Sequence, residues 1–93
     1  MHEMGIASSV LEAIDQELRR YPGHRATKVA LRIGEFAGVD RESLEFCFGA
    51  LVKNTELEPL DLEIEWCLAK DGRRGDELEF AYLELDEAKE AAA

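Results

Sequence analysis

Apolar residues recur at helical spacing in two segments of the chain. In residues 5–21, aliphatic side chains occupy every fourth position: Ile6, Val10, Ile14 and Leu18. This spacing places them on one face of an amphipathic helix, which Pro22 and Gly23 then stop. The second segment follows Asp40, a good helix-capping residue, and its apolar residues are Leu44, Cys47, Phe48, Leu51 and Val52. The pattern predicts two helices, each with one face for a core.

Two further segments alternate between apolar and other residues, which is typical of strands. In residues 27–34 the positions that share one face are Val29, Leu31 and Ile33. On the opposite face, Lys28 and Arg32 would either meet a partner or be solvated. In residues 61–68 the positions expected to face the core are Leu62, Ile64, Trp66 and Leu68. Cys67 is then expected to face outward.

The last strand is predicted at residues 77–85, where the alternation changes phase. Leu78 and Phe80 share one phase, whereas Leu83 and Leu85 share the opposite one. A β-bulge near Ala81 and Tyr82 would reconcile the two halves. The preceding "AKDGRRGD" contains two glycines and resembles a hairpin loop, so we expect the last two strands to pair antiparallel.

The predicted order is helix, strand, helix, strand, strand. The strand–helix–strand unit should form a right-handed parallel crossover. The expected fold class is therefore two-layer α+β, with a mixed three-stranded sheet and both helices on one face. Residues 1–86 would form this single domain. The tail at 87–93 favours a helix but lacks an apolar face, so we expect it to fray.

The charge balance restricts the classes of partner. The 93 residues include 21 acidic and 11 basic ones, a formal net charge of −10. Nucleic acids and anionic membranes would be repelled by this charge. No signal-peptide pattern opens the chain, so a cytoplasmic location is the default expectation. The serines have no nearby histidine and no phosphate-binding loop occurs, so we do not expect an enzyme.

The opening "MHE" groups donors that suit a metal ion. The amine of Met1 and the amide and imidazole nitrogens of His2 can close adjacent chelate rings, and Glu3 adds an amide or a carboxylate. Such nitrogen donors favour Ni(II) or Cu(II). Alternatively, His2 is an exposed bystander and Glu3 interacts with the helix start. Asp40 could add an oxygen ligand, although a helix cap is its more ordinary role.

Four stretches together resemble one family: "MHEMGIASSVLEAI", "KVALRIGEFAGVDRESLEFCF", "LEIEW" and "LEFAYLEL". They are similar to the HypA/HybF hydrogenase maturation proteins, which are small nickel metallochaperones. The resemblance implies a nickel site at His2 and Glu3 with the Met1 amine, and less directly Asp40. It also implies two partners, a nickel GTPase of hydrogenase maturation and the precursor of the hydrogenase large subunit.

The chain departs from the family pattern between the last two strands. Members normally carry a zinc ribbon with two CxxC pairs there, whereas this chain has only Cys47 and Cys67 and no CxxC. Four soft ligands are needed for such a site, so we expect no zinc. Either the ribbon is naturally absent or it has been removed. A metal-free adaptor in hydrogenase assembly is the alternative function.

Overall fold

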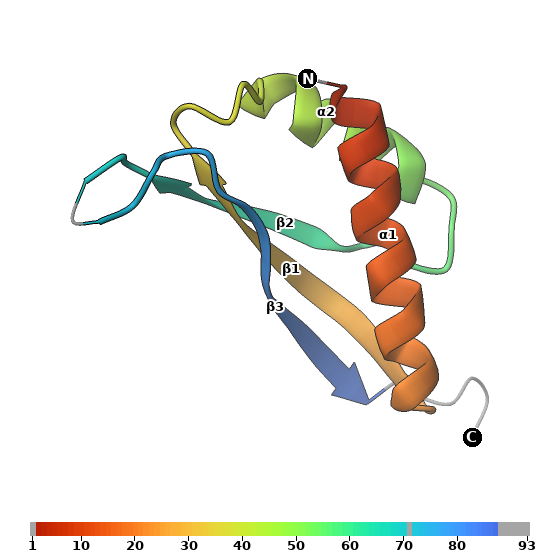
Figure 1. The fold of residues 1–93 in the computed structure, drawn as a ribbon. Helices are drawn as coiled ribbons and strands as arrows, with labels where there is room; N and C mark the ends of the chain where they lie inside the picture. Colours follow the sequence, from red (N-terminus) through yellow and green to blue (C-terminus); the bar gives the residue numbers. More distant parts are fainter. Residues whose placement is uncertain (1, 71, 88–93) are drawn as a thin grey trace.

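The structure, a computed structural model, describes residues 2–70 and 72–87. Five elements follow one another in the predicted order (Figure 1): α1 (Glu3–Arg20), β1 (His24–Gly34), α2 (Arg41–Val52), β2 (Asp61–Cys67) and β3 (Leu78–Glu87). The first strand begins at His24, before the predicted start, because β3 is long enough to pair with it there. The last strand ends at Glu87, and the remaining tail residues, 88–93, lie outside the described residues.

The sheet has the strand order β2-β1-β3. Strands β1 and β2 are parallel and β1 and β3 are antiparallel, which confirms the mixed sheet and the parallel crossover. The predicted antiparallel pairing of the last two strands is wrong. The chain between β2 and β3 passes the end of β1, so β3 pairs with the opposite edge of β1. The central strand thereby satisfies the hydrogen-bonding groups on both of its edges.

Backbone hydrogen bonds fix the crossing of this connection over the end of β1. The Gly34 amide donates to the Glu77 carbonyl at 2.8 Å, and the Phe36 amide donates to the Gly75 carbonyl at 2.6 Å. A Cβ atom on Gly34 would lie 2.1 Å from the Gly75 carbonyl oxygen. Glycine at this position therefore permits a close approach of two backbone segments.

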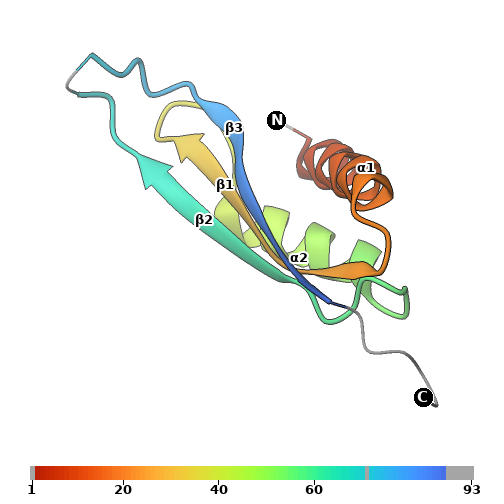
Figure 2. The ribbon, with the colours of Figure 1, turned by 90° about the horizontal axis from the view of Figure 1, so that it is seen from below.

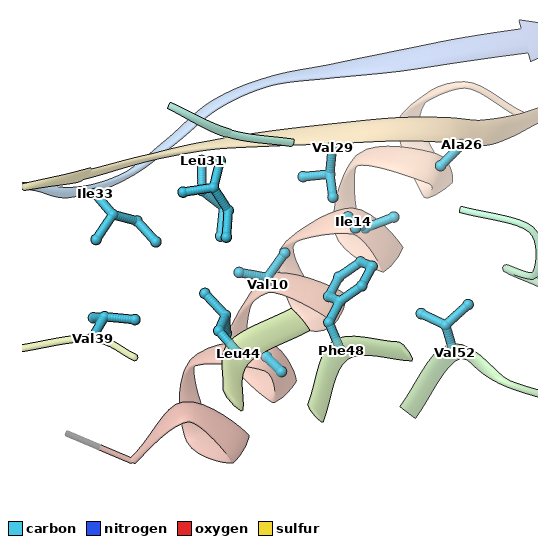
Figure 3. Close-up of a cluster of buried hydrophobic side chains, with 12 residues drawn as sticks. Val10, Ile14, Ala26, Val29, Leu31, Ile33, Val39, Leu44, Phe48 and Val52 are labelled. Atoms are coloured by element: carbon cyan, nitrogen blue, oxygen red, sulfur yellow. The ribbon is translucent and has the colours of Figure 1, made fainter. Parts of the chain in front are cut away.

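Both helices cover one face of the sheet (Figure 2), and the core lies between the two layers. Figure 3 shows the inward side chains of β1 meeting those of both helices, and the largest fully buried ones are Ile14, Leu31, Ile33, Leu44 and Val29. These residues occupy the predicted apolar positions. The helical and strand periodicities therefore identified the core correctly.

The end of β2 differs from the prediction. Trp66 and Leu68 are 41% and 46% exposed instead of buried, because this end of the sheet extends beyond the helices. Cys67 was expected to be exposed, yet only 2% of its surface is accessible. It lines a pocket with Arg32 and Glu65 of the open face and with residues 72–74, 76 and 77 of the connection to β3, so this connection covers it.

The predicted bulge in β3 is confirmed. Ala30 pairs with Tyr82 and Leu31 with Phe80, so Ala81 is the extra residue. The bulge restores the inward phase for the second half of the strand, where Leu83 packs against the core.

The open face of the sheet carries ion pairs. The Lys28 ammonium lies 3.4 Å from a Glu63 oxygen, and the Arg32 guanidinium lies 3.3 Å from a Glu65 oxygen. Both cations therefore interact with β2. No helix among the described residues has the length and apolar character required to cross a membrane.

Candidate metal centre

The first helix begins directly behind His2. His2 occupies the N-cap position with an extended backbone, and its side chain makes no capping hydrogen bond. Its carbonyl accepts the Ile6 amide at 3.2 Å, which fixes the His2 backbone to the first helical turn. The imidazole is exposed to solvent. A metal ion could therefore reach it without any rearrangement of the core.

Glu3 connects the beginnings of the two helices. Its Oε2 accepts a hydrogen bond from the backbone amide of Asp40 at 3.0 Å, although the two residues are far apart in sequence. Figure 1 shows the first turn of α1 beside α2. The fold therefore brings together Glu3 and Asp40, two of the four predicted site residues.

Asp40 caps α2, as predicted. Its Oδ1 accepts the backbone amide of Ser43 at 3.1 Å, which satisfies one of the unpaired donors in the first turn. Each of the two carboxylates thus uses one oxygen in a structural hydrogen bond.

The hydrogen bond from the Asp40 amide lowers the pKa of Glu3, and a hydrogen bond from its own backbone amide adds to the effect. Partial desolvation opposes this shift. The pKa is lowered overall because an amide donor stabilises the ionised carboxylate. Glu3 therefore remains a charged oxygen donor further into the acid range than an ordinary glutamate.

Side chains alone do not complete a metal site in the part of the chain that is described. No group of three or more His, Cys, Asp or Glu side chains is placed to hold a metal ion there. The donor set predicted from the sequence depends instead on backbone nitrogen and on the amine of Met1, a residue outside the described ranges. His2 and Glu3 directly follow Met1 in the chain. The predicted chelate therefore needs only one imidazole, because its other nitrogen donors are the terminal amine and the backbone.

A groove beside His2 was not predicted. It lies between α1 and β3, has a volume of about 480 Å³ and is lined mainly by apolar groups. The sequence contained a partial signal, since the small residues Gly5, Ser9 and Ala13 follow one another at four-residue spacing and all line the groove. The strand that forms the other wall of the groove, β3, could not be identified without the correct sheet order.

Comparison with known protein families identifies the family to which this chain belongs. The family model described as "Hydrogenase/urease nickel incorporation, metallochaperone, hypA" matches residues 1–71. The chain belongs to the HypA family. The resemblance noted in the sequence is thereby confirmed, and the α1, β1, α2 and β2 elements all lie inside the matched HypA region.

Curated HypA proteins give the same result. The chain is 48% identical over 65 residues to the hydrogenase maturation factor HypA of Chlorobaculum tepidum, an alignment that covers 70% of this chain and 58% of that protein. It is 41% identical over 69 residues to HypA of Chlorobaculum parvum, with 74% and 61% covered. For HypA of Geotalea uraniireducens the identity is 41% over 81 residues, with 87% and 71% covered. The chain thus spans less than two thirds of the length of the first two HypA relatives.

Proposed function

We propose that this protein is a nickel carrier for the maturation of [NiFe]-hydrogenase. In this proposal Ni(II) is cargo, bound by the Met1 amine and by His2, with Glu3 or Asp40 as an oxygen donor. Membership of the HypA family supports nickel as the metal. The structural observation that best supports the position is the hydrogen bond from the Asp40 amide to Glu3, which gathers the carboxylates behind His2.

The proposed chemistry is reversible chelation. The His2 imidazole must be neutral to bind, so affinity should fall in mild acid. Because His2 is exposed, a receiving protein could replace the ligands one at a time. Glu3 could offer its second oxygen while the first retains the Asp40 amide. These properties suit transient binding and release by a carrier, and we expect no catalytic activity.

Isothermal titration of the untagged protein with Ni(II) tests the position of the site. We expect His2→Ala to abolish binding, whereas His24→Ala should leave it unchanged. The control is well matched because His24 is also exposed but lies at the start of β1. Equal binding by the wild type and His2→Ala would refute the assignment. Acetylation of the Met1 amine should also abolish binding, since an acetylated nitrogen can no longer act as the amine donor of the chelate.

Metal analysis of the loaded protein tests the expected selectivity. Nickel should be present and zinc absent, because the two cysteines lie on α2 and at the end of β2 instead of forming paired CxxC ligands. Stoichiometric zinc in protein purified without chelator would contradict this expectation.

The proposed partners are a nickel GTPase and the precursor of the hydrogenase large subunit. A metal-free adaptor for the same assembly is the second candidate function. It is favoured by one observation, that Glu3 and Asp40 each already use an oxygen in a structural hydrogen bond. Capture of the large-subunit precursor by both the chelator-treated wild type and His2→Ala would support the adaptor. Loss of capture in both would support the carrier.

A further inference from the structure

The groove between α1 and β3 has an exposed apolar wall on the β3 side. Leu78 and Phe80 are 41% and 39% exposed there, and Ile6 and Val10 of α1 line the opposite side. Helix α1 packs on α2 and β1, and Figure 2 shows it on the β3 side of the sheet. The groove therefore lies between the N-terminal half of α1 and the first residues of β3, Leu78–Phe80, and His2 is among its lining residues.

Strand β3 is an edge strand. It pairs with β1 on one side, and in the described part of the chain no strand pairs with its other side. Its residues Leu78–Glu87 thus present a row of backbone donors and acceptors, and the groove lies beside the first three of these residues. An additional strand could form hydrogen bonds to this edge while its inward side chains entered the groove, which is the geometry of β-augmentation.

The charges on β3 indicate the composition of such a strand. Every charged residue of β3 is acidic: Glu79, Glu84, Asp86 and Glu87. In the β1–β3 ladder, Glu79, Glu84 and Asp86 are paired with Arg32, Lys28 and Arg25 respectively. These three acidic residues therefore lie on the face of the sheet away from the helices. These carboxylates already face basic residues of β1, and a Glu79 oxygen lies 4.0 Å from the Arg32 guanidinium. Basic side chains on a strand at the free edge would approach the same carboxylates from the other side, and opposite charges directly across a ladder are stabilising.

A second copy of this chain fits the edge poorly. Pairing β3 with another β3 would bring acidic side chains against acidic side chains, because the strand carries no lysine or arginine. Like charges across a ladder are destabilising. The net charge of −10 adds a general repulsion between copies.

We propose that the edge of β3 binds an extended segment of a partner protein in which apolar and basic side chains alternate. The apolar side chains occupy the groove against Val10 and Phe80. The basic side chains lie beside Glu79, Glu84 and Asp86 on the open face. This contact needs no metal, so the segment should bind in the presence of chelator.

A short synthetic peptide that alternates valine and lysine, with a fluorescent label, serves as the probe. Anisotropy with the full chain in the presence of chelator should show saturable binding. Phe80→Ser should weaken binding by about tenfold or more, because it removes a large apolar contact. Phe46→Ser is the matched control, since Phe46 is 75% exposed on α2 and does not line the groove. Its affinity should equal that of the wild type.

The charge contribution has its own pair of variants. Glu79→Gln should weaken binding by about two- to fivefold, the range expected for one cross-strand ion pair. Glu42→Gln removes the same charge from α2 and should have no effect. Circular dichroism verifies the folding of each variant. If Phe80→Ser fails to fold, Leu78→Ser, on the same groove wall, takes its place with the same expected loss.

Two altered peptides test the strand geometry itself. N-methylation at alternate residues blocks one edge of an extended peptide, so one methylated set should abolish binding and the other should retain it. Equal binding of both sets would overturn the proposal. The proposal would also be overturned if the alternating peptide and a peptide with the same composition but with all lysines first bound equally well. That result would indicate attraction by charge alone. A dimer in sedimentation that Phe80→Ser dissociates, with no peptide binding, would assign the edge to a second copy instead.

Discussion

Replacement of Gly34 by alanine tests how the connection between β2 and β3 is held. The added Cβ would lie 2.1 Å from the Gly75 carbonyl oxygen and 2.3 Å from its carbonyl carbon. Both atoms belong to the backbone, so no side-chain rotation can relieve the contact. The connection must move away from the end of β1.

This movement puts two backbone hydrogen bonds at risk. The amides of Gly34 and Phe36 donate to the carbonyls of Glu77 and Gly75 in the connection, at 2.8 and 2.6 Å respectively. With about 0.5–1.5 kcal/mol for each bond, their loss amounts to roughly 2 kcal/mol of the free energy of unfolding. That is a large fraction of the stability of a small domain.

Urea denaturation followed by tryptophan fluorescence measures the effect, since Trp66 lies near the end of β2. The same substitution at Gly49 is the control, because an added Cβ there meets nothing within 4 Å. In the interior of α2, Gly49→Ala should stabilise the protein by about 0.5–1 kcal/mol. Gly34→Ala should destabilise it by about 2 kcal/mol. Equal free energies for Gly34→Ala and the wild type would refute the argument from close backbone contact.

Three further predictions concern single groups. Asp40→Ala should lower the free energy of unfolding by about 1 kcal/mol through loss of the α2 cap, whereas Asp40→Asn should lose little; urea denaturation of both variants distinguishes them. Because its pKa is lowered, the Glu3 carboxylate adds stability above its unfolded pKa and loses it as the pH falls. The urea midpoint should therefore fall further for the wild type than for Glu3→Gln between about pH 6 and pH 3, and parallel curves would contradict this. The hydrogen bond to Glu63 raises the pKa of Tyr82, so in Tyr21→Phe protein the addition of Glu63→Gln should shift the phenol titration, measured by ultraviolet absorbance, to lower pH.

Local patterns predicted most of the fold. Helical spacing located both helices and their buried faces, and the change of phase in the last strand located the bulge at Ala81. The antiparallel pairing of the last two strands was inferred from the glycines of their connection, and it was wrong. Loop composition indicates that a chain turns, but it does not indicate which edge of β1 the next strand joins. That choice depends on tertiary contacts such as those of Gly34.

The candidate site was predictable in its chemistry but not in its contacts. The donors of "MHE" and the capping role of Asp40 could be inferred from residue types. The hydrogen bond from the Asp40 amide to Glu3 joins two helices and has no local signal. The groove beside His2 was missed for the same reason, since its second wall, Phe80, belongs to the strand whose partner was assigned incorrectly.

The strand order also has a consequence for how this domain is made during translation. The central strand β1 is synthesised before both of its neighbours, and β3, which covers one whole edge of β1, is the last element of the sheet. Until Leu78–Glu87 has left the ribosome, β1 has an open edge and the wall of the groove is incomplete. Closing this ladder requires contacts between distant parts of the chain, which form slowly. The sheet and the groove can therefore be completed only after the final strand has emerged.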